Sequence, residues 1–145
     1  MTSVAAVLTT ICSLIKERAG VTAVVGGTAR TTRIAVWPWQ LVPSVAQGVP
    51  PPLRPPATEP GAPPIRELEL RVLLVCTGTP VAIDALTRAH HVLVDNPVLN
   101  VDNAKVQIVA APLSAVELTA LFSAAQVPLR LSASFTLRLS AQANA

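Results

Sequence analysis

The last strongly patterned stretch of the chain, residues 129–140, alternates strictly between apolar and polar residues. One set of positions holds Leu, Leu, Ala, Phe, Leu and Leu, and the other holds Arg, Ser, Ser, Thr, Arg and Ser. Because successive side chains of a strand point to opposite faces, this period of two predicts a half-buried β-strand. Its polar face carries Arg130 and Arg138. The pattern contains no catalytic grouping, which directs attention to partners before substrates.

A short helix is predicted just before this strand, after Pro112. Ser114 and Glu117 have the spacing of a capping box, in which each side chain satisfies an amide of the first helical turn. Leu113 and Leu118 flank the box as a hydrophobic staple, which fixes the direction in which the chain enters the helix. We therefore expect a capped helix that leads directly into the alternating strand.

The first helix is predicted to run from a cap at Thr2 or Ser3 to about Ala19, with Gly20 as its stop. Its apolar residues recur at helical spacing and form one stripe that a core can bury. These residues are Val4, Val7, Leu8, Ile11, Leu14 and Ile15.

Two short strands are predicted next, at residues 21–25 and 32–37, with a turn at Gly26 and Gly27 between them. Pro38 either ends the second strand or confines it to an edge of the sheet, because proline has no amide for a strand ladder. Residues 32–37 are therefore our candidate for an exposed sheet edge.

Prolines are concentrated in residues 38–64, which hold ten of the fourteen in the chain. Runs such as Pro50-Pro51-Pro52 predict an extended, partly polyproline loop without regular structure. A loop of this length in a compact domain is usually either functional or disordered.

The middle of the chain becomes continuously apolar. Residues 66–76 begin in alternation and end in the run at 72–75, as expected for a central strand that is covered on both faces. Thr79 and Pro80 then have the positions of an N-cap and a first helical residue, so they open a second helix.

The second helix is expected to end before Pro97, and residues 105–111 predict a further short strand. The chain therefore belongs to the α/β (α+β) class. We predict a single layered domain over residues 1–145, with a mixed β-sheet packed by about three helices and a long proline-rich loop at residues 38–64.

Hydrophobic residues make up 51% of the chain and charged residues 13%, and the mean hydropathy is +0.53. Soluble domains usually carry about 25% charged residues. Either other subunits cover much of this surface, or Ala and Val inflate the apolar count, and the composition leaves both readings open.

No apolar run reaches the roughly 20 unbroken residues of a membrane span, and no basic segment precedes the first apolar run. We therefore expect cytosolic synthesis and no membrane partner.

Two groups of residues resemble metal or redox sites only superficially. Cys12 and Cys76 fall where buried faces are expected, which favours small core residues over a disulfide or a metal pair. His90 and His91 are adjacent on a helix, so their side chains point about 100° apart and do not chelate one ion together. The sequence thus predicts no metal site and no cofactor.

Motifs of enzymes and of nucleic-acid binding are missing from the sequence. There is no nucleophile elbow, no glycine-rich phosphate loop and no paired carboxylates at a plausible site. The eleven basic residues are scattered, and only four aromatic residues accompany them, whereas a nucleic-acid surface needs clustered charge and stacking rings. We expect no catalytic residues and no nucleic-acid partner.

Four residues are candidates for a contact with a partner or another subunit. Trp37 and Trp39 lie on the same side of a strand if it alternates, and they fit either a core or an interface, where Trp is enriched. Arg130 and Arg138 fit either a solvated face or a contact with an acidic partner.

The order of three segments resembles the N-terminal domain family of the cap, or tail-terminator, proteins of extracellular contractile injection systems. The resemblance covers about residues 65–139 best, and the order of the motifs carries it rather than any single one. Phe122 and Leu129 depart from the Trp and Tyr that are frequent in the family. The segments are the strand at residues 66–76, the helix end at residues 89–99 with the sequence Ala-His-His-Val-Leu-Val-Asp-Asn-Pro-Val-Leu, and Pro112-Leu113-Ser114-x-x-Glu117-Leu118-x-x-Leu121-Phe122 with the strand after it.

The resemblance implies a tail-terminator-like fold and a structural, non-enzymatic role. Such a protein forms a six-fold ring, a homohexamer, that stops growth of the inner tube and anchors the last layer of the sheath. Its implied partners are its own copies, the inner tube protein and the sheath protein. It would be assembled in the bacterial cytoplasm and become part of the injection particle. A sheath subunit could attach by adding a strand to the edge at residues 32–37.

Two alternatives stay open at this point. One is a tail-completion or connector protein of a tailed phage, which has a related task. The other is a small α/β interaction module that a partner recognises through the proline-rich loop at residues 38–64.

Overall fold

A computed structural model describes residues 3–43 and 65–142 and shows three helices and one mixed sheet. The strands follow the order β1-β2-β3-β6-β5-β4, and every neighbouring pair is antiparallel except β1 and β2. The predicted α+β class with a mixed sheet is confirmed. The helices are α1 (Val4–Ala19), α2 (Pro80–Asp95) and α3 (Ala115–Ala124), and the strands are β1 (Thr22–Val25), β2 (Arg33–Pro43), β3 (Ile65–Val75), β4 (Val98–Val101), β5 (Ala104–Ala110) and β6 (Ser132–Gln142).

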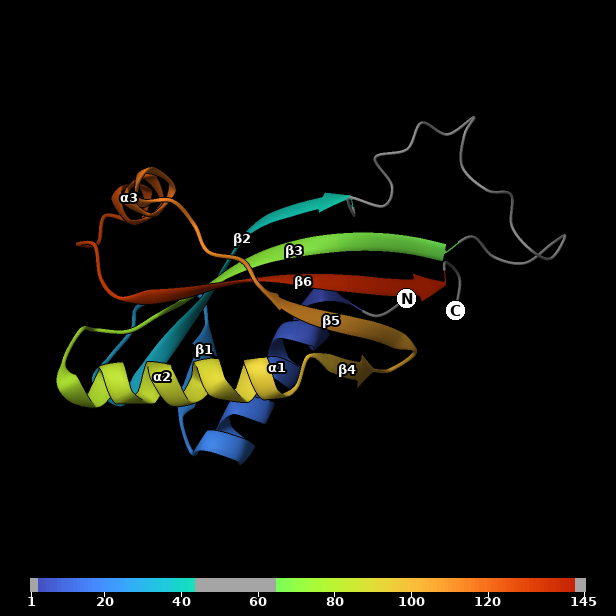
Figure 1. Ribbon diagram of the computed structural model, residues 1–145, viewed down its shortest axis with the longest axis horizontal. Coiled ribbons are helices and arrows are strands. Elements are labelled where there is room, and N and C mark those ends of the chain that lie inside the picture. The colour runs from blue at the N-terminus through green and yellow to red at the C-terminus, as the bar shows by residue number, and fades with distance from the viewer. Residues whose placement is uncertain (1–2, 44–64, 143–145) are drawn as a thin grey trace, which may run out of the picture.

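The sheet separates two hydrophobic clusters of different size. Helices α1 and α2 pack on one face, and α3 lies over one end of the opposite face (Figure 1). Strand β3 supplies both clusters, because Val72 and Leu74 point toward α1 and α2 while Leu73 and Val75 point toward α3. The central position that the continuous apolar run of this strand predicted is thereby confirmed.

The helices begin where the sequence placed their caps. The hydroxyl oxygens of Ser3 and Thr79 accept hydrogen bonds from the amides of Ala6 and Ala82, at 3.0 and 3.3 Å. Gly20 ends α1 in the left-handed conformation, with φ of 68°. Because these signals are local, they do not depend on the rest of the fold.

The capping box of α3 is present in a modified form. Ser114 Oγ accepts from the amide of Glu117 at 3.1 Å, as predicted. The Glu117 carboxylate, however, accepts from the Ser114 hydroxyl, also at 3.1 Å, in the place of the backbone amide that we expected. Leu113 and Leu118, the predicted staple, both pack against the small cluster beneath α3.

Strand β2 is longer than predicted, and Pro38 does not end it. Val36 O accepts from Gly26 N on the β1 side, so Pro38, two residues later, directs its nitrogen to the same side. Strand β1 has already ended there, and the missing amide therefore breaks no bond with β3. The prediction of an open edge at residues 32–37 is wrong for 33–36, which pair with β1, and the open edge begins at Trp37.

Two other boundaries also differ from the prediction. The alternation at residues 129–140 begins before β6 does, because β3 and β5 offer no partner beyond Val75 and Ala111, and so Arg130 lies in the preceding loop. Strand β4 was missed altogether. It forms a tight hairpin with β5, in which Asp102 has a φ of +53°.

Of the proline-rich segment predicted at residues 38–64, residues 44–64 lie outside the described part of the chain. Its first residues, from Pro38 to Pro43, form the end of β2. None of the helices in residues 3–43 and 65–142 has both the length and the hydropathy that crossing a membrane would require.

Both cysteines pack as core residues, as predicted. Cys76 is fully buried, whereas Cys12 is half-buried, and both thiols are free. Burial raises the pKa of the Cys12 thiol. Because a raised pKa leaves less of the reactive thiolate at a given pH, alkylation of Cys12 should be slow at neutral pH.

We expect iodoacetamide at pH 8 to modify Cys12 several-fold more slowly than glutathione, with a rate that still rises above that pH. Cys76 should react only after denaturation, because no part of it is accessible. Mass spectrometry of digested protein measures both rates. Rapid labelling of Cys76 in the native protein would contradict the packing described above.

Candidate interaction surface

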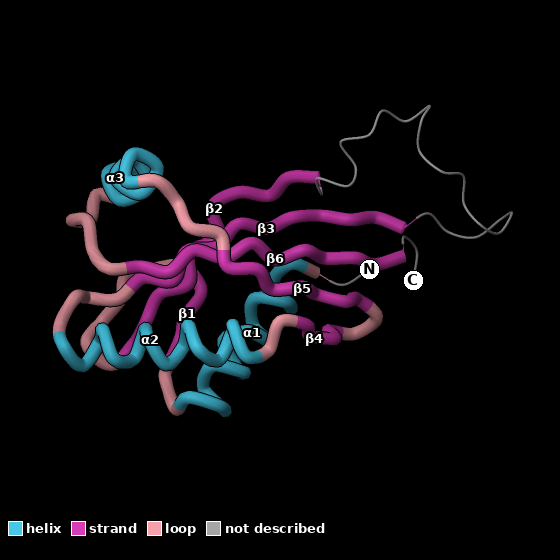
Figure 2. Tube along the Cα trace, in the orientation of Figure 1, coloured by secondary structure: helices cyan, strands magenta, loops and turns pink. Residues whose placement is uncertain are grey.

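The face of the sheet that α1 and α2 do not cover is polar beyond the end occupied by α3. Cross-strand neighbours build it in two rows, from Gln40 through Arg71 to Thr136, and from Glu69 through Arg138 to Gln107. We call these six residues the polar sheet face. Their strands run side by side in Figure 2. The alternation of β3 places Glu69 and Arg71 here, because Leu70 and Val72 between them point into the main core.

Glu69 and Arg138 form an ion pair at the centre of this face. Arg138 Nε lies 3.4 Å from Glu69 Oε1, with the Glu69 side chain 4% exposed and that of Arg138 49% exposed. A buried carboxylate needs partners that offset its lost hydration. Because Arg138 is half in solvent, the pair itself stabilises the fold little. The guanidinium remains accessible to a partner.

Arg71 is held in place by the neighbouring strand β2. Its Nη1 donates to Gln40 Oε1 at 2.8 Å, and its guanidinium carbon lies 5.8 Å from the centroid of the Trp39 ring. This distance fits a cation–π contact, which at an exposed site contributes about 0.5–1 kcal/mol. The charge of Arg71 is therefore presented at a defined place beside Arg138.

The two tryptophans lie on the same side of β2, as predicted, and both pack against the small cluster below α3. Trp37 anchors this cluster, because its ring centroid is 5.5 Å from that of Phe122 and its Nε1 donates to Gly27 O at 2.9 Å. Trp39 differs, since its buried Nε1 has no acceptor among the described residues. Such a donor is costly to leave unpaired.

The structure brings only some of the four predicted interface residues together. Arg138 belongs to the polar sheet face, and Trp39 borders this face beside Arg71. Arg130 lies apart, in the loop before the other end of β6. Sequence reasoning missed Arg71, although the alternation of Glu67, Glu69 and Arg71 with apolar residues was a visible signal.

The two adjacent histidines differ in exposure and in their ring contacts. His90 is half-buried with its ring 5.5 Å from that of Phe135, whereas His91 is exposed and its ring centroid is 6.0 Å from that of His90. Within residues 3–43 and 65–142, no three His, Cys, Asp or Glu side chains are grouped as a metal site requires.

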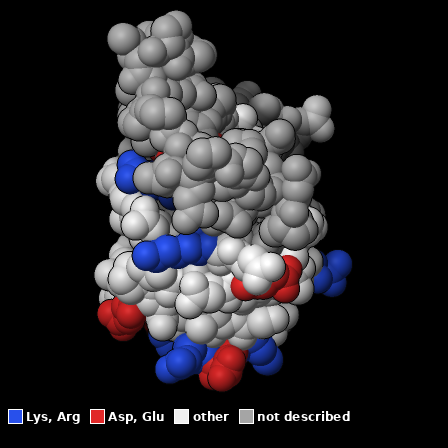
Figure 3. Space-filling model, turned by 90° about the vertical axis from the view of Figure 1, so that its right-hand side faces the viewer, with Lys and Arg blue, Asp and Glu red and all other residues white. Residues whose placement is uncertain are grey.

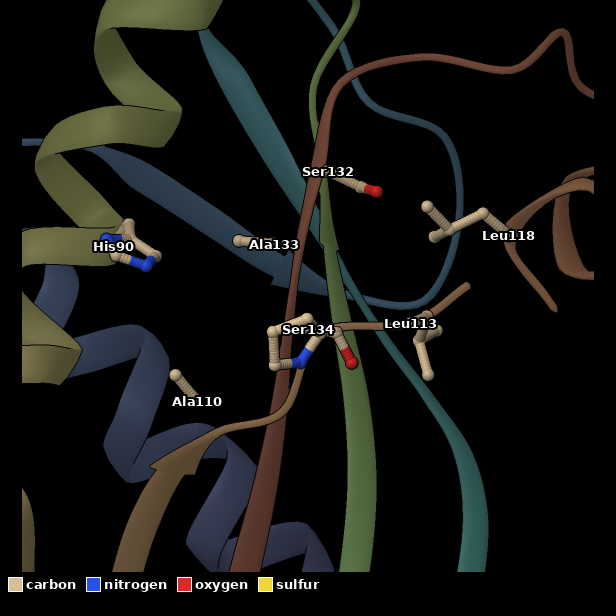
Figure 4. A pocket seen from close by; sticks show the side chains of 8 residues that line it. His90, Ala110, Leu113, Leu118, Ser132, Ala133 and Ser134 are labelled. Atoms are coloured by element: carbon tan, nitrogen blue, oxygen red, sulfur yellow. The ribbon is translucent and has the colours of Figure 1, made fainter. Parts of the chain in front are cut away.

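A shallow hollow beside β6 contains His90 at one side. Figure 4 shows His90 reaching in from α2, with Leu113 and Leu118 across β6 and the Ser132 hydroxyl on the strand. The hollow has a volume of about 270 Å³. Among the described contacts, no hydrogen bond joins the imidazole to Ser132 or Ser134. A nucleophile and its base need such a bond or one within easy reach.

Charged side chains are spread thinly over the described surface. Figure 3 views the end of the molecule that lies to the right in Figure 1, where small blue and red groups are separated by broad uncharged areas. This agrees with the low charge content of the sequence.

Comparison with known proteins gives results of two kinds. A family model described as the Pvc16 N-terminal domain matches residues 6–143. The solved structures that match in fold include a PVC sheath/tube terminator of an extracellular contractile injection system in the extended state and the tube-terminating cap of the anti-feeding prophage. No curated protein matches the chain by sequence.

The structural matches extend over the whole chain at low sequence identity. The terminator has a TM-score of 0.72 at 13% identity, with 100% of this chain and 58% of that chain covered. The cap has a TM-score of 0.70 at 14% identity, with 99% and 56% covered. This chain therefore spans little more than half the length of either, and the likeness concerns the fold.

Proposed function

Because this chain belongs to the Pvc16 N-terminal domain family, we propose that it is a structural cap of a contractile injection system. In this role a homohexameric ring of the protein ends the inner tube and holds the last layer of the sheath. The observation that carries the proposal is the fold match, over 100% and 99% of the chain, to a sheath/tube terminator and to a tube-terminating cap. Assembly would take place in the bacterial cytoplasm, before the particle is complete.

The task requires one binding face and no chemistry. A tube grows by head-to-tail stacking of rings, a contact that repeats without closing. A terminator must match one exposed tube face and present a different face outward, as a capping repeat does in a solenoid. The polar sheet face and the helical face of this protein differ in the way such a role demands.

The polar sheet face is the surface that we assign to the tube. Arg71 and Arg138 present two guanidinium groups on neighbouring strands, and arginine is enriched in protein interfaces. An acidic rim on the last tube ring would complement them. Trp39 lies beside Arg71 at the border of this surface.

Tube growth in the presence of the protein tests the function. Purified tube protein should polymerise into tubes whose mean length falls as the amount of cap rises, because each ring ends one tube. Negative-stain electron microscopy measures the lengths and shows whether a ring sits at the tube end. Tubes of unchanged length, without density at their ends, would refute the role.

Two arginine substitutions test the surface. Arg138→Gln and Arg71→Gln should each weaken tube binding about tenfold or more, equivalent to about 1.4 kcal/mol, since each removes one charged contact. The matched control is Arg88→Gln, which removes an exposed arginine from α2 on the other side of the sheet. Co-sedimentation with tubes measures binding. Equal loss in all three variants would show that net charge, and not this face, is responsible.

A further inference from the structure

The two outermost strands of the sheet are short and alike. Strands β1 and β4 have four residues each and lie at opposite ends of the strand order (Figure 2). Each pairs with one neighbour, and no described strand pairs with its outer side. The sheet therefore ends on both sides in a strand that can accept another.

The outward backbone groups of β1 follow from its bond to β2. Gly26 N donates to Val36 O, so Gly26 faces β2. By the period of two, Val24 faces β2 as well, and Ala23 and Val25 direct their N–H and C=O groups away from the sheet. The outer edge of β1 thus presents two complete backbone positions.

The same reasoning applies to β4. Ile108 N donates to Pro97 O, so Pro97 faces β5. Alternation then turns Leu99 toward β5 and directs the backbone groups of Val98 and Asn100 outward. The outer edge of β4 also presents two complete backbone positions, which equals the number on β1.

Both outer strands are very short, which itself limits unwanted strand pairing, but they lack the other features that proteins use against it. Such features are charged side chains, proline and bulges. The open part of β2 has two of them, an outward-facing Pro38 and a break in register between Pro38 and Gln40. Strands β1 and β4, with the sequences Thr-Ala-Val-Val and Val-Leu-Asn-Val, contain no charge and no proline. The open part of β2 therefore carries proline and a register break, whereas β1 and β4 have only their shortness against strand pairing.

Exposed valines and a groove accompany these edges. Val24, Val25 and Val98 are 37%, 42% and 45% exposed. A groove of about 430 Å³ lies beside β1, between Thr22 and Ala23 and the flank of α1, and Lys16 and Glu17 of α1 also line it. Side chains of an added strand would have apolar surface to cover at both edges.

We propose that β4 of one copy adds to β1 of the next, so that neighbouring copies of this chain share one continuous sheet. A second copy is the occupant that fits best, because the edges are equal in length, equally uncharged and equal in outward backbone groups. They lie at opposite ends of the sheet, which makes the contact head-to-tail and allows a closed ring. The inference rests on the proposed function only in that a cap is expected to be a ring.

Two proline variants test the pairing. Val25→Pro and Asn100→Pro each remove one outward amide and leave the bonds to the neighbouring strand in place. Each variant alone should self-associate at least about tenfold more weakly than the wild type in sedimentation analysis. Val25→Ala and Asn100→Ala, which keep the amide, are the matched controls and should associate nearly normally. Circular dichroism and thermal melting verify that each variant folds. If one variant unfolds, the other still tests the pairing, because the two substitutions lie on different strands.

Mixing the variants gives the decisive result. The Val25→Pro protein keeps an intact β4 and the Asn100→Pro protein keeps an intact β1, so their mixture should form a one-to-one pair and nothing larger. Unchanged association of either variant, or a mixture that stays monomeric, would overturn the proposal. Intact rings that lose only sheath binding would also overturn it and assign the edge to the sheath. A wild-type protein that is monomeric with and without tube protein would overturn it too.

The same experiments test the proposed cap role separately from the β1–β4 contact. If rings of the Val25→Pro variant persist and still shorten tubes, the cap role holds and the β1–β4 contact is wrong. If wild-type copies associate through these edges but leave tube length unchanged, the contact holds and the cap role is wrong.

Discussion

Replacing Phe122 by alanine should release α3 from the sheet and leave the rest of the fold in place. Phe122 is 1% exposed and is the one buried residue of this helix, where it packs with Leu73 and Val75. Large-to-small changes of buried Phe cost about 3–5 kcal/mol. Here the loss falls on a small cluster that the sheet separates from the main core. Local unfolding is therefore the expected response.

Hydrogen exchange measures this effect element by element. Amides of α3 should lose protection in Phe122→Ala, while those of β3 and β6 keep most of theirs. The fluorescence of Trp37 should also change, because its ring centroid lies 5.5 Å from that of Phe122. Val116→Ala is the control on the same helix, since Val116 is 80% exposed and should shift stability by less than about 0.5 kcal/mol. Equal loss of protection across the sheet would contradict separate clusters.

Replacing Phe135 by alanine should instead destabilise the whole domain. Phe135 is 1% exposed at the middle of β6, belongs to the main cluster and lies 5.5 Å from His90. The same loss of about 3–5 kcal/mol now falls on the core shared by α1, α2 and four or more strands. For a domain of this size we expect the melting temperature to fall by roughly 10 °C.

Calorimetry and chemical denaturation measure this change. A single unfolding transition should persist in Phe135→Ala, at lower temperature. Protection of the amides against hydrogen exchange should fall in all elements together. Phe135→Leu, which keeps most of the buried volume, should cost clearly less. If the melting temperature fell no further in Phe135→Ala than in Phe135→Leu, the protein would have closed the cavity at this position, and the prediction would be wrong.

Helix positions could be predicted from the sequence because their signals are local. Ser3, Thr79 and Ser114 accept their hydrogen bonds within three residues, and no distant contact is needed to place them. The central position of β3 was also predictable, since residues 72–75 are apolar on both faces.

Strand order could not be read from the sequence. The central pair joins β3 to β6, which are separated in the chain by two helices and two strands, and no local pattern encodes such a pairing. Strand β4 was missed because its four residues follow directly on the end of α2. The turn at Asp102 and Asn103 was its available signal.

The candidate surface was predicted in part for a similar reason. Arg138 was placed on a polar strand face correctly, but its neighbour Glu69 and the nearby Arg71 belong to a different strand. Which polar faces meet depends on sheet order, so a surface made of several strands emerges only with the fold. Arg130 was misplaced because alternation continued beyond the partner strands.

The pairing of β3 with β6 also governs when the protein can fold during translation. Residues 65–75 leave the ribosome well before residues 132–142, yet the two segments are hydrogen-bonded neighbours at the centre of the sheet. Until the later segment emerges, β3 has no partner on that side, and β5 with β4 has no strand to join. Under the proposed pairing of β1 with β4, a nascent copy would therefore have no β4 joined to its central strands until residues 132–142 have emerged.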